Sequence, residues 1–409
     1  MKQTDFFHDY RERKEHQIVG LMSGTSLDGV DAVLVSITTD EHQHVLNVTL
    51  LDQVSLPYTK EVKEKVSNLC IPKNADIKDL TLAHFGLAYW NAAAVNALID
   101  KGPYDKNLID GISMHGQTVW HAPVAESFPG PLGPIDVTGT LQIGNAQLVS
   151  SLTGLTVISD FRSADMAEGG QGAPLAPYID YLLFGNKEKG IAVQNIGGIG
   201  NVTVLPFGGD AESVFAFDTG PGNMIIDRIV SIGTNDSMQY DDGGAIASRG
   251  NVSQVLLSSL MEDPYFSMKP PKSTGREVYG DAFAQSFWKK GLALGLSFED
   301  LVATSTAFTA HSIAQSYKDF VLPVTPLHTV IVSGGGARNK TLLSMLSELL
   351  PNEIEVMISD DFGVPDQARE AMAFALMGHE SLMGRPGNIP SVTGARKSVV
   401  LGVVTMQHI

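Results

Sequence analysis

Three apolar, strand-like runs in this chain each lead directly into a glycine-rich loop. The loops cover residues 22–26, 195–201 and 332–336. Because glycine has no side chain, successive backbone N–H groups in such loops can approach and surround an anionic oxygen. The first two loops are each followed by another strand-like run, at residues 30–37 and 202–205. Two hairpin turns of one design predict a duplicated phosphate-binding element.

The bulk properties of the chain limit which partners it can bind. Its 409 residues are enough for two domains, and 43 % hydrophobic with 18 % charged residues is the composition of a globular protein. The formal net charge of -17 disfavours binding to nucleic acid or to an anionic membrane surface. We therefore expect no nucleic-acid or membrane partner, and we expect any bound phosphate to be held by local dipoles.

The cysteine content and the N-terminal sequence indicate a cytoplasmic protein. Cys70 is the only cysteine, which excludes an intrachain disulfide and a cysteine-based zinc site. Residues 1–17 are polar and charged, without the apolar core of a signal peptide. No apolar run reaches the roughly 20 residues that span a bilayer. A cytoplasmic location is the simplest expectation.

The order of strand and helix patterns predicts an α/β fold with an internal duplication. A strand, a glycine turn and a second strand span residues 18–37, and a third strand is expected at 45–56. A long helix is expected at 80–99, and strand character then returns. The order of strand, glycine turn and strand repeats within residues 191–217. The second half of the chain is therefore expected to be a divergent copy of the first.

We expect two related domains, with the C-terminal segment of the chain returning to the first domain. The first would comprise residues 1–158 together with 386–409, and the second residues 159–385. Within the long helix the apolar side chains lie roughly along one face: Leu82, Phe85, Tyr89, Ala93 and Leu98.

Two common nucleotide-binding motifs are missing from the chain. No glycine loop ends in Gly-Lys-Ser or Gly-Lys-Thr, which excludes the lysine-bearing phosphate loop. The glycines at 197–200 precede a strand, whereas the dinucleotide-binding fingerprint needs a helix there. For each glycine loop taken alone, a tight hairpin without a ligand is the alternative interpretation.

Asp28 and Asp31 could orient a hydrated Mg²⁺ beside the first loop, although Asp28 could equally stabilise its own turn.

Asp218 is the candidate catalytic base. It follows the expected strand at 215–217 and opens a tight turn before a helix. Its alternative role is to cap that turn or helix. Asp160 and Asp165 are rival bases, for which an ion pair with Arg162 is the alternative account.

Polar loop residues supply the donors and acceptors that a sugar needs. His115 and His121 have no Glu or Cys at ligand spacing that would complete a metal site, so they are interpreted as contacts to a substrate. Amide side chains lie in or beside the glycine-rich loops: Gln117, Gln142, Asn145, Gln171 and Asn223. Each of these could instead satisfy a backbone group.

A series of motifs runs in order from about residue 18 to the C-terminus. They are Gly-Leu-Met-Ser-Gly-Thr-Ser-Leu-Asp-Gly at 20–29, His-Gly-Gln-Thr at 115–118, Gln-Ile-Gly-Asn at 142–145, Asp-Phe-Arg at 160–162, Gly-Gly-Gln-Gly-Ala-Pro at 169–174, Asn-Ile-Gly-Gly at 195–198, Phe-Asp-Thr-Gly-Pro-Gly-Asn at 217–223, Pro-Lys-Ser-Thr-Gly-Arg-Glu at 271–277 and Ser-Gly-Gly-Gly-Ala at 333–337. Together they closely resemble the bacterial anhydro-N-acetylmuramic acid kinase family. Residues 1–17 extend beyond the usual start of this pattern and have no expected role.

The resemblance implies an actin-like, sugar-kinase fold, in which two related ribonuclease H-like α/β domains flank a cleft for ATP and a sugar. The implied reaction converts 1,6-anhydro-N-acetylmuramic acid, water and ATP into N-acetylmuramic acid 6-phosphate and ADP. It belongs to murein (cell-wall) sugar recycling. Asp218 matches the family's catalytic aspartate, which would take a proton from the water that attacks the anomeric carbon while O6 attacks the γ-phosphate. Glu370 matches a glutamate at the sugar site.

The loops and the resemblance together give two sets of candidate residues. The expected ATP or phosphate contacts are Gly24, Thr25, Ser26, Leu27, Asp28, Gly29, Val30, Asp31, Gly197, Gly198, Gly200, Asn201, Gly334, Gly335 and Gly336. The expected sugar contacts are His115, Gln117, Gln142, Asn145, Asp160, Gln171, Asn223 and Glu370.

Two alternative functions share the expected fold. An ordinary sugar kinase would use Asp218 to deprotonate a free hydroxyl of an amino sugar, and it would not require the 1,6-anhydro bond. A nucleotide-dependent assembly protein like actin would retain its nucleotide and form filaments. By analogy with other sugar kinases, a homodimer is also expected.

Overall fold

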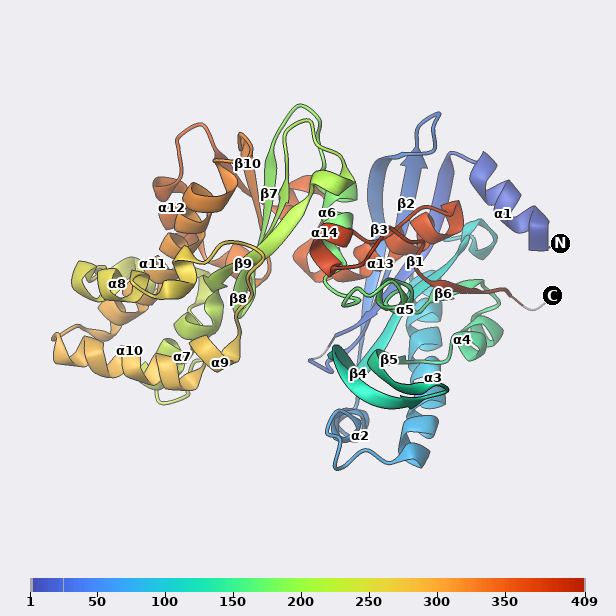
Figure 1. Cartoon of the computed structure of the whole chain (residues 1–409), viewed down its shortest axis with the longest axis horizontal. Helices are drawn as coiled ribbons and strands as arrows, with labels where there is room; N and C mark the ends of the chain where they lie inside the picture. The colour runs from blue at the N-terminus through green and yellow to red at the C-terminus, as the bar shows by residue number, and fades with distance from the viewer. Residues whose placement is uncertain (1–2, 25, 408–409) are drawn as a thin grey trace. The chain divides into compact units, whose positions relative to one another are not determined.

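The structure is a computed structural model that describes residues 3–24 and 26–407. The chain forms two compact units, which are described separately below. Unit 1 consists of Met1–Leu183 and Gly363–Ile409, and unit 2 consists of Phe184–Phe362. Figure 1 labels most of the helices and strands of both.

Unit 1 is built on a seven-stranded sheet in the order β12-β6-β4-β1-β2-β3, with β5 paired to β4 outside this order. Strands β1, β2 and β3 form an antiparallel meander, while β4 runs parallel to both β1 and β6. The strands are β1 (Glu15–Ser23), β2 (Gly29–Thr39), β3 (Val45–Pro57), β4 (Gly111–Gly130), β5 (Gly133–Ile143), β6 (Val157–Ser159) and β12 (Val403–Thr405).

Helices cover both faces of the sheet in unit 1. Val19 and Leu21 of β1 pack with the long helix α3 in one hydrophobic core. The intervening Gly20 faces α13, because successive strand residues point to opposite faces, and a Cβ there would lie 2.0 Å from the Ala371 carbonyl oxygen. The helices are α1 (Gln3–Glu12), α2 (Lys60–Leu69), α3 (Ile77–Lys101), α4 (Ala146–Thr153), α5 (Ser163–Ala167), α6 (Ala176–Phe184), α13 (Asp366–Met383) and α14 (Pro390–Thr393).

Unit 2 is built on a five-stranded sheet in the order β11-β10-β7-β8-β9. Its strands are β7 (Ile191–Ile196), β8 (Ile199–Leu205), β9 (Phe215–Pro221), β10 (Thr329–Ser333) and β11 (Glu355–Ile358). Its helices are α7 (Asn223–Gly233), α8 (Gln254–Met261), α9 (Arg276–Tyr279), α10 (Asp281–Ala293), α11 (Phe298–Ser316) and α12 (Lys340–Leu349). One hydrophobic cluster packs helices against the sheet, and a second, rich in aromatic side chains, lies mainly among the helices.

The two units repeat one strand topology. In each, an antiparallel meander of three strands is followed by two further strands that lie parallel to its first strand: β3-β2-β1-β4-β6 in unit 1 and β9-β8-β7-β10-β11 in unit 2. This order is the ribonuclease H-like topology of actin-like proteins. The prediction of two related α/β domains is confirmed.

The unit boundaries fall at residues 183/184 and 362/363, and not at the expected 158/159 and 385/386. The difference comes from α6 and α13, which both pack within unit 1. Arg369 of α13 pairs with Asp180 of α6, and the Tyr178 hydroxyl donates to Glu380 Oε2 over 2.7 Å. These long-range side-chain contacts leave no local signal in the sequence.

The expected helix at 80–99 exists as α3, but the apolar stripe read from its sequence mostly faces solvent. Leu82 is 61 % exposed, whereas Leu98 is fully buried. The buried face mixes three alanines with larger side chains: Leu87, Ala88, Asn91, Ala92, Ala94, Val95 and Leu98. In the described part of the chain, no helix combines the length and the low polarity needed to cross a bilayer.

Candidate active site

The first glycine loop joins β1 to β2 in unit 1. The Leu27 N–H donates to the Gly24 carbonyl over 3.2 Å, which closes the turn. Among the described atoms, a Cβ on Gly24 would meet only Ser26, at 3.6 Å or more, so the backbone at this position is open. Thr25, an expected phosphate contact, lies outside the described residues.

Three expected phosphate contacts belong to strand β2 and not to this loop. Gly29, Val30 and Asp31 are paired with β3, and Val30 is fully buried in the unit 1 core. The Val30 side chain therefore cannot touch a ligand. The loop itself spans residues 24–28.

Asp28 is occupied by an exposed ion pair. Its Oδ1 accepts from Lys63 Nζ over 3.0 Å, and hydrogen bonds from Lys63 and Ser26 lower the pKa of Asp28. Among the residues that the structure describes, no group of three or more His, Cys, Asp or Glu side chains could hold a metal ion. Asp28 would thus offer Mg²⁺ a carboxylate that is already paired.

Asp31 and Glu370 bring two carboxylates into electrostatic contact in unit 1. Asp31 Oδ1 accepts from Ser55 Oγ over 2.6 Å. Glu370 reaches solvent, but the protein around its carboxylate raises the pKa of Glu370, Arg369 lowers it, and the charges of Asp31 and Asp366 raise it further. Because Mg²⁺ usually takes one or two carboxylates plus water and substrate phosphates, Asp31 and Glu370 are two further candidate carboxylates for a hydrated ion.

His115 and Gln117 on β4 each keep a buried polar atom without a partner among the described residues. These atoms are His115 Nδ1 and Gln117 Oε1. His115 Nε2 accepts from Arg162 Nη2 over 3.0 Å, while burial and the Arg162 charge lower the pKa of His115 to about 3. Gln117 Nε2 donates to the Gly24 carbonyl over 3.1 Å. A neutral histidine N–H donor and an amide acceptor are therefore available next to the first glycine loop.

Four other expected sugar contacts are engaged within unit 1 or face solvent. Gln142 Nε2 donates to two threonine hydroxyls, at 2.8 and 3.2 Å. Asn145 caps α4, and Asp160 accepts from the Ser163 hydroxyl over 2.7 Å. The Gln171 side chain is exposed. Local structural roles thus account for Asn145 and Asp160.

Asp165 has the surroundings of a structural carboxylate. It is fully buried and accepts from the Gly172 N–H over 2.8 Å, the Thr393 hydroxyl over 2.6 Å and the Asn388 amide over 2.6 Å. The expected ion pair with Arg162 does not occur among the described residues, because that guanidinium donates to the Gly172 carbonyl and to the histidine on β4. An aspartate whose oxygens are already occupied in this way is poorly suited to act as a base.

The second glycine loop is the turn between β7 and β8 in unit 2. The Gly197 carbonyl accepts from the Asn223 N–H over 2.7 Å, and the Gly198 carbonyl accepts from the N–H groups of Gly222 and Met224. The N-terminus of α7 is therefore already occupied by this turn. The N–H groups of the two turn glycines donate to no described residue, and a Cβ on Gly197 would meet nothing closer than 3.8 Å.

The third glycine loop packs tightly against β7. Gly334 has a φ of +79°, and a Cβ there would lie 2.8 Å from the Ile196 carbonyl oxygen. A Cβ on Gly336 would lie 2.4 Å from the Ile196 side chain, whereas Gly335 has only the Asn223 amide nearby. Close backbone packing explains the glycines at 334 and 336 without a ligand.

A row of polar residues crosses four strands of the unit 2 sheet. Ser333 of β10 pairs with Asn195 of β7, Asn195 pairs with Asn201 of β8, and Asn201 pairs with Asp218 of β9. Directly opposed residues in a sheet point to the same face. The sheet therefore presents an amide group beside the candidate base.

Asp218 lies inside β9, next to a β-bulge, and not in the turn that the sequence predicted. Gly200 pairs with Gly220 and Asn201 with Asp218, so Thr219 is the extra residue on β9. Bulges of this kind change the direction of a neighbouring side chain. Gln194 Nε2 donates to the Thr219 hydroxyl over 3.2 Å, which holds the bulge from the buried side.

The segment from Tyr265 to Thr274 holds Asp218 at three points. The Asp218 N–H donates to the Lys272 carbonyl, the Tyr265 hydroxyl donates to the Asp218 carbonyl over 2.7 Å, and the Thr274 N–H donates to Asp218 Oδ2 over 3.0 Å. Oδ1 has no hydrogen-bond partner among the described residues. Burial raises the pKa of Asp218, and the Thr274 hydrogen bond partly opposes this. Our sequence prediction missed Tyr265 and Thr274.

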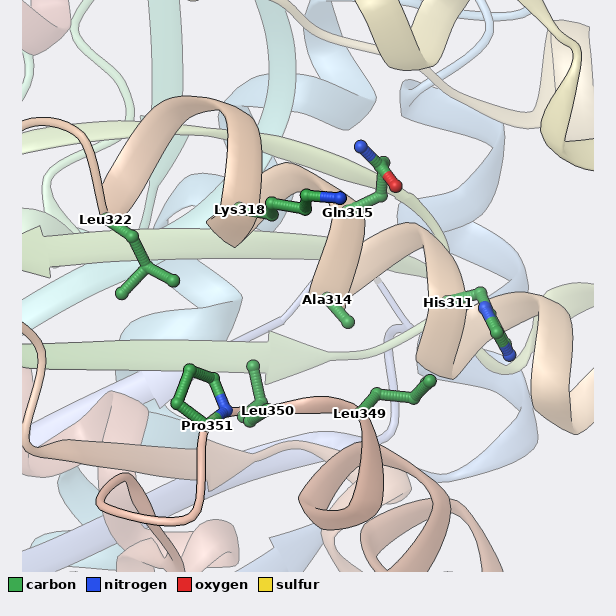
Figure 2. Close-up of a pocket in the computed structure, with 8 residues that line it drawn as sticks. All are labelled: His311, Ala314, Gln315, Lys318, Leu322, Leu349, Leu350 and Pro351. Carbon is green, nitrogen blue, oxygen red and sulfur yellow. The ribbon is translucent and has the colours of Figure 1, made fainter.

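Figure 2 shows a pocket of about 430 Å³ elsewhere in unit 2. It is lined by residues from α11, the turn after it and the end of α12: His311, Ala314, Gln315, Lys318, Leu322, Leu349, Leu350 and Pro351. None of the expected ATP, sugar or catalytic residues lines it. We therefore do not assign the reaction to this pocket.

Comparison with known proteins gives consistent results over nearly the whole chain. The model of the family described as anhydro-N-acetylmuramic acid kinase matches residues 16–407. A protein of that name from Caldanaerobacter subterraneus subsp. tengcongensis is 43 % identical over 394 residues, covering 96 % of this chain and 98 % of its own. One from Clostridioides difficile is 41 % identical over 388 residues, covering 95 % and 97 %. One from Bacillus cereus is 40 % identical over 393 residues, covering 96 % and 100 %.

The family match includes β1 at one end of the chain and β12 at the other, so it spans both units. It also includes Asp218 and the loops that the geometry singles out. By this match and by its identity to these relatives, the chain belongs to the anhydro-N-acetylmuramic acid kinase family.

Proposed function

We propose that this chain is an ATP-dependent kinase for 1,6-anhydro-N-acetylmuramic acid. It would convert the anhydro sugar, water and ATP into N-acetylmuramic acid 6-phosphate and ADP. The observation that carries the chemistry is the carboxylate of Asp218, which is half-buried, held by one oxygen and free at the other. The identity of the sugar rests on the family to which the chain belongs.

Asp218 would act as the general base. Its N–H and carbonyl are fixed by Lys272 and Tyr265, and its Oδ2 by Thr274, so Oδ1 is left to accept a proton from water. Burial raises the pKa of Asp218 and so strengthens its carboxylate as a proton acceptor. As the water attacks the anomeric carbon, the bond from that carbon to O6 breaks, and O6 attacks the γ-phosphorus of ATP.

The open glycine loops would bind the phosphates of ATP. Gly24 and Gly197 have space where a Cβ would stand, and the turn at Gly197 and Gly198 has N–H groups without partners among the described residues. Preorganised N–H groups stabilise the negative charge that develops during phosphoryl transfer. Asp31 with Glu370 would hold a hydrated Mg²⁺, which neutralises phosphate charge when bound.

Unpartnered polar atoms favour His115 and Gln117 as sugar contacts in unit 1. His115 Nδ1 and Gln117 Oε1 are buried without partners, and a sugar hydroxyl or amide would satisfy both. Glu370 would also lie near the sugar. We further propose that the enzyme works in the cytoplasm in cell-wall sugar recycling and, by analogy with other sugar kinases, as a homodimer.

Release of ADP from Mg²⁺-ATP tests the proposal directly. The purified protein is mixed with 1,6-anhydro-N-acetylmuramic acid or, in parallel, with N-acetylmuramic acid or N-acetylglucosamine. We expect turnover with the anhydro sugar alone, and a 6-phosphate as the product. Turnover with a free sugar instead would replace the substrate and the role of water, and stable filaments with retained nucleotide would favour an assembly protein.

A further inference from the structure

The hydroxyl oxygen of Thr274 is buried and has no hydrogen-bond partner among the described residues. A buried hydroxyl without a partner destabilises the folded state, because it has lost its hydrogen bonds to water and gained none in the protein. Such groups are uncommon in folded proteins, and each calls for an explanation. A ligand that supplies the missing partner is one explanation, and its plausibility depends on what surrounds the group.

Thr274 is the residue that holds the candidate base. Its N–H donates to Asp218 Oδ2 over 3.0 Å, so a single residue fixes the carboxylate and carries the unsatisfied hydroxyl. Asp218 Oδ1 also has no partner among the described residues. The two free oxygens, Thr274 Oγ1 and Asp218 Oδ1, thus belong to residues joined by a hydrogen bond. One small polar ligand could satisfy both.

Unit 2 contains a useful contrast in Tyr279. Its hydroxyl is also buried without a partner, but its ring packs edge-on against the rings of Tyr265, Phe283 and Phe308. Its hydroxyl therefore lacks the link to a carboxylate that distinguishes Thr274. The Tyr279 hydroxyl is thus only buried, whereas the Thr274 hydroxyl is buried and also adjoins the candidate base.

We propose that Thr274 is a second catalytic residue, whose hydroxyl oxygen accepts one hydrogen of the attacking water while Asp218 Oδ1 accepts the other. This inference rests on the proposed function. With both hydrogens held, a lone pair of the water oxygen is directed at the anomeric carbon. In the reaction the water oxygen bonds to that carbon, its proton passes to Asp218, and the bond from the carbon to O6 breaks. O6 then bonds to the γ-phosphorus of ATP, and ADP leaves. Thr274 orients the water and neither gains nor loses a proton.

The Thr274→Val variant tests this role, because it removes the hydroxyl and keeps the backbone N–H that binds Asp218. We expect kcat to fall roughly tenfold or more, the change expected when a hydrogen bond made in the transition state is lost. The KM values for ATP and sugar should change little. The melting temperature should stay the same or rise, since an apolar group replaces an unsatisfied polar one. Thr274→Ser should recover most of the lost turnover.

Tyr279→Phe is the matched control. It also removes an unpartnered buried hydroxyl from unit 2, and it should leave kcat unchanged while the melting temperature stays the same or rises.

The acid limb of the pH–rate profile should not move in Thr274→Val, because the hydrogen bond to Asp218 Oδ2 is retained.

Three results would overturn the assignment of Thr274: wild-type kcat in Thr274→Val, a raised KM for ATP at unchanged kcat, or a Thr274→Ser variant as impaired as Thr274→Val. The first would make the hydroxyl structural, and the second would assign it to the nucleotide. The sugar preference of the wild-type enzyme reports separately on the proposed function. If the wild type turns over only a free sugar, the proposed function and the water-holding role fail together, whereas a failure in Thr274→Val alone leaves the anhydro-sugar reaction intact.

Discussion

The three aspartates that compete for the role of base differ in what their oxygens contact. Asp165 is buried against three donors, and Asp160 accepts from a neighbouring serine. Asp218 has one oxygen bound to a backbone N–H and the other free among the described residues. A base must be fixed in position and must also have a free oxygen. Asp165 fails the second condition, and Asp160 is bound only through one oxygen, by Ser163 three residues away. Asp218 is the best held of the three with an oxygen free, because Lys272 and Tyr265 also bind its backbone.

The pH dependence of activity should report on Asp218. Its pKa is raised above the ordinary value of 3.8 by burial, and the base works only when ionised. The rate should therefore fall as pH decreases, along an acid limb whose midpoint lies above 3.8. The measurement is kcat/KM against pH for the wild-type enzyme. A limb at or below the ordinary aspartate value would argue against this base.

Asp218→Asn should abolish turnover and leave ATP binding largely intact, because the amide keeps the size of the side chain but not its basicity. The variant should also be more stable than the wild type at neutral pH. A carboxyl whose folded-state pKa is raised destabilises the fold once pH exceeds its unfolded value, and the amide removes that penalty. Thermal melts at pH 7 and near pH 3 test this, since the difference should vanish at the lower pH. Near-normal turnover would remove Asp218 from the base role.

At this scale the sequence predicts Asp218 as the candidate base but does not predict which residues hold it. The strand before Asp218 and the glycines after it are local signals. Thr274 lies 56 residues away, and its relation to Asp218 depends on the folding of unit 2. An unsatisfied oxygen also depends on three-dimensional surroundings, so no local pattern marks it. The same applies to the long-range contacts of Asp165.

Among the elements, α3 shows most clearly how apolar spacing can misidentify a buried face. Its large apolar residues at positions 82, 85 and 89 are exposed, while the buried face combines three alanines with Leu87, Asn91, Val95 and Leu98. Small residues let the helix approach the strands closely. A pattern that gives weight to large side chains therefore selects the wrong face.

A matched pair of leucines on α3 tests this assignment. Leu98→Ala should lower the free energy of unfolding by about 2–5 kcal/mol, because it leaves a cavity in the unit 1 core. Leu82→Ala should change it by less than about 0.5 kcal/mol, because that side chain is 61 % exposed. Denaturant unfolding of the two variants gives the comparison. Equal losses would mean that both leucines are covered.

The hairpins of the meanders were predictable because strand, turn and strand are adjacent in the sequence. The strand pair β6 and β12 was not, because two three-residue strands so far apart leave little pattern. From the sequence the boundary is expected at 158/159, because no local pattern indicates that α6 belongs to unit 1. The helices α6 and α13 join unit 1 through contacts between distant side chains, such as Arg369 with Asp180.

For the whole molecule, the two units differ in continuity. Unit 2 is one uninterrupted segment, while unit 1 needs both ends of the chain. We expect a fragment of residues 184–362 to unfold cooperatively on heating, as followed by circular dichroism. A fragment of residues 1–183 should not, because its sheet lacks β12 and the covering helix α13. A cooperative transition in the second fragment would show that α13 is dispensable for folding.

The insertion of unit 2 within unit 1 also sets an order of events during synthesis. The ribosome delivers the whole of residues 184–362 before α13 emerges, so the second unit can complete its sheet while the first still exposes the face of β1 at Gly20. The part of the protein that is made first is therefore finished last. A translation stop shortly after residue 362 would release a chain with one complete unit and one open sheet, which is a substrate for chaperones and proteases.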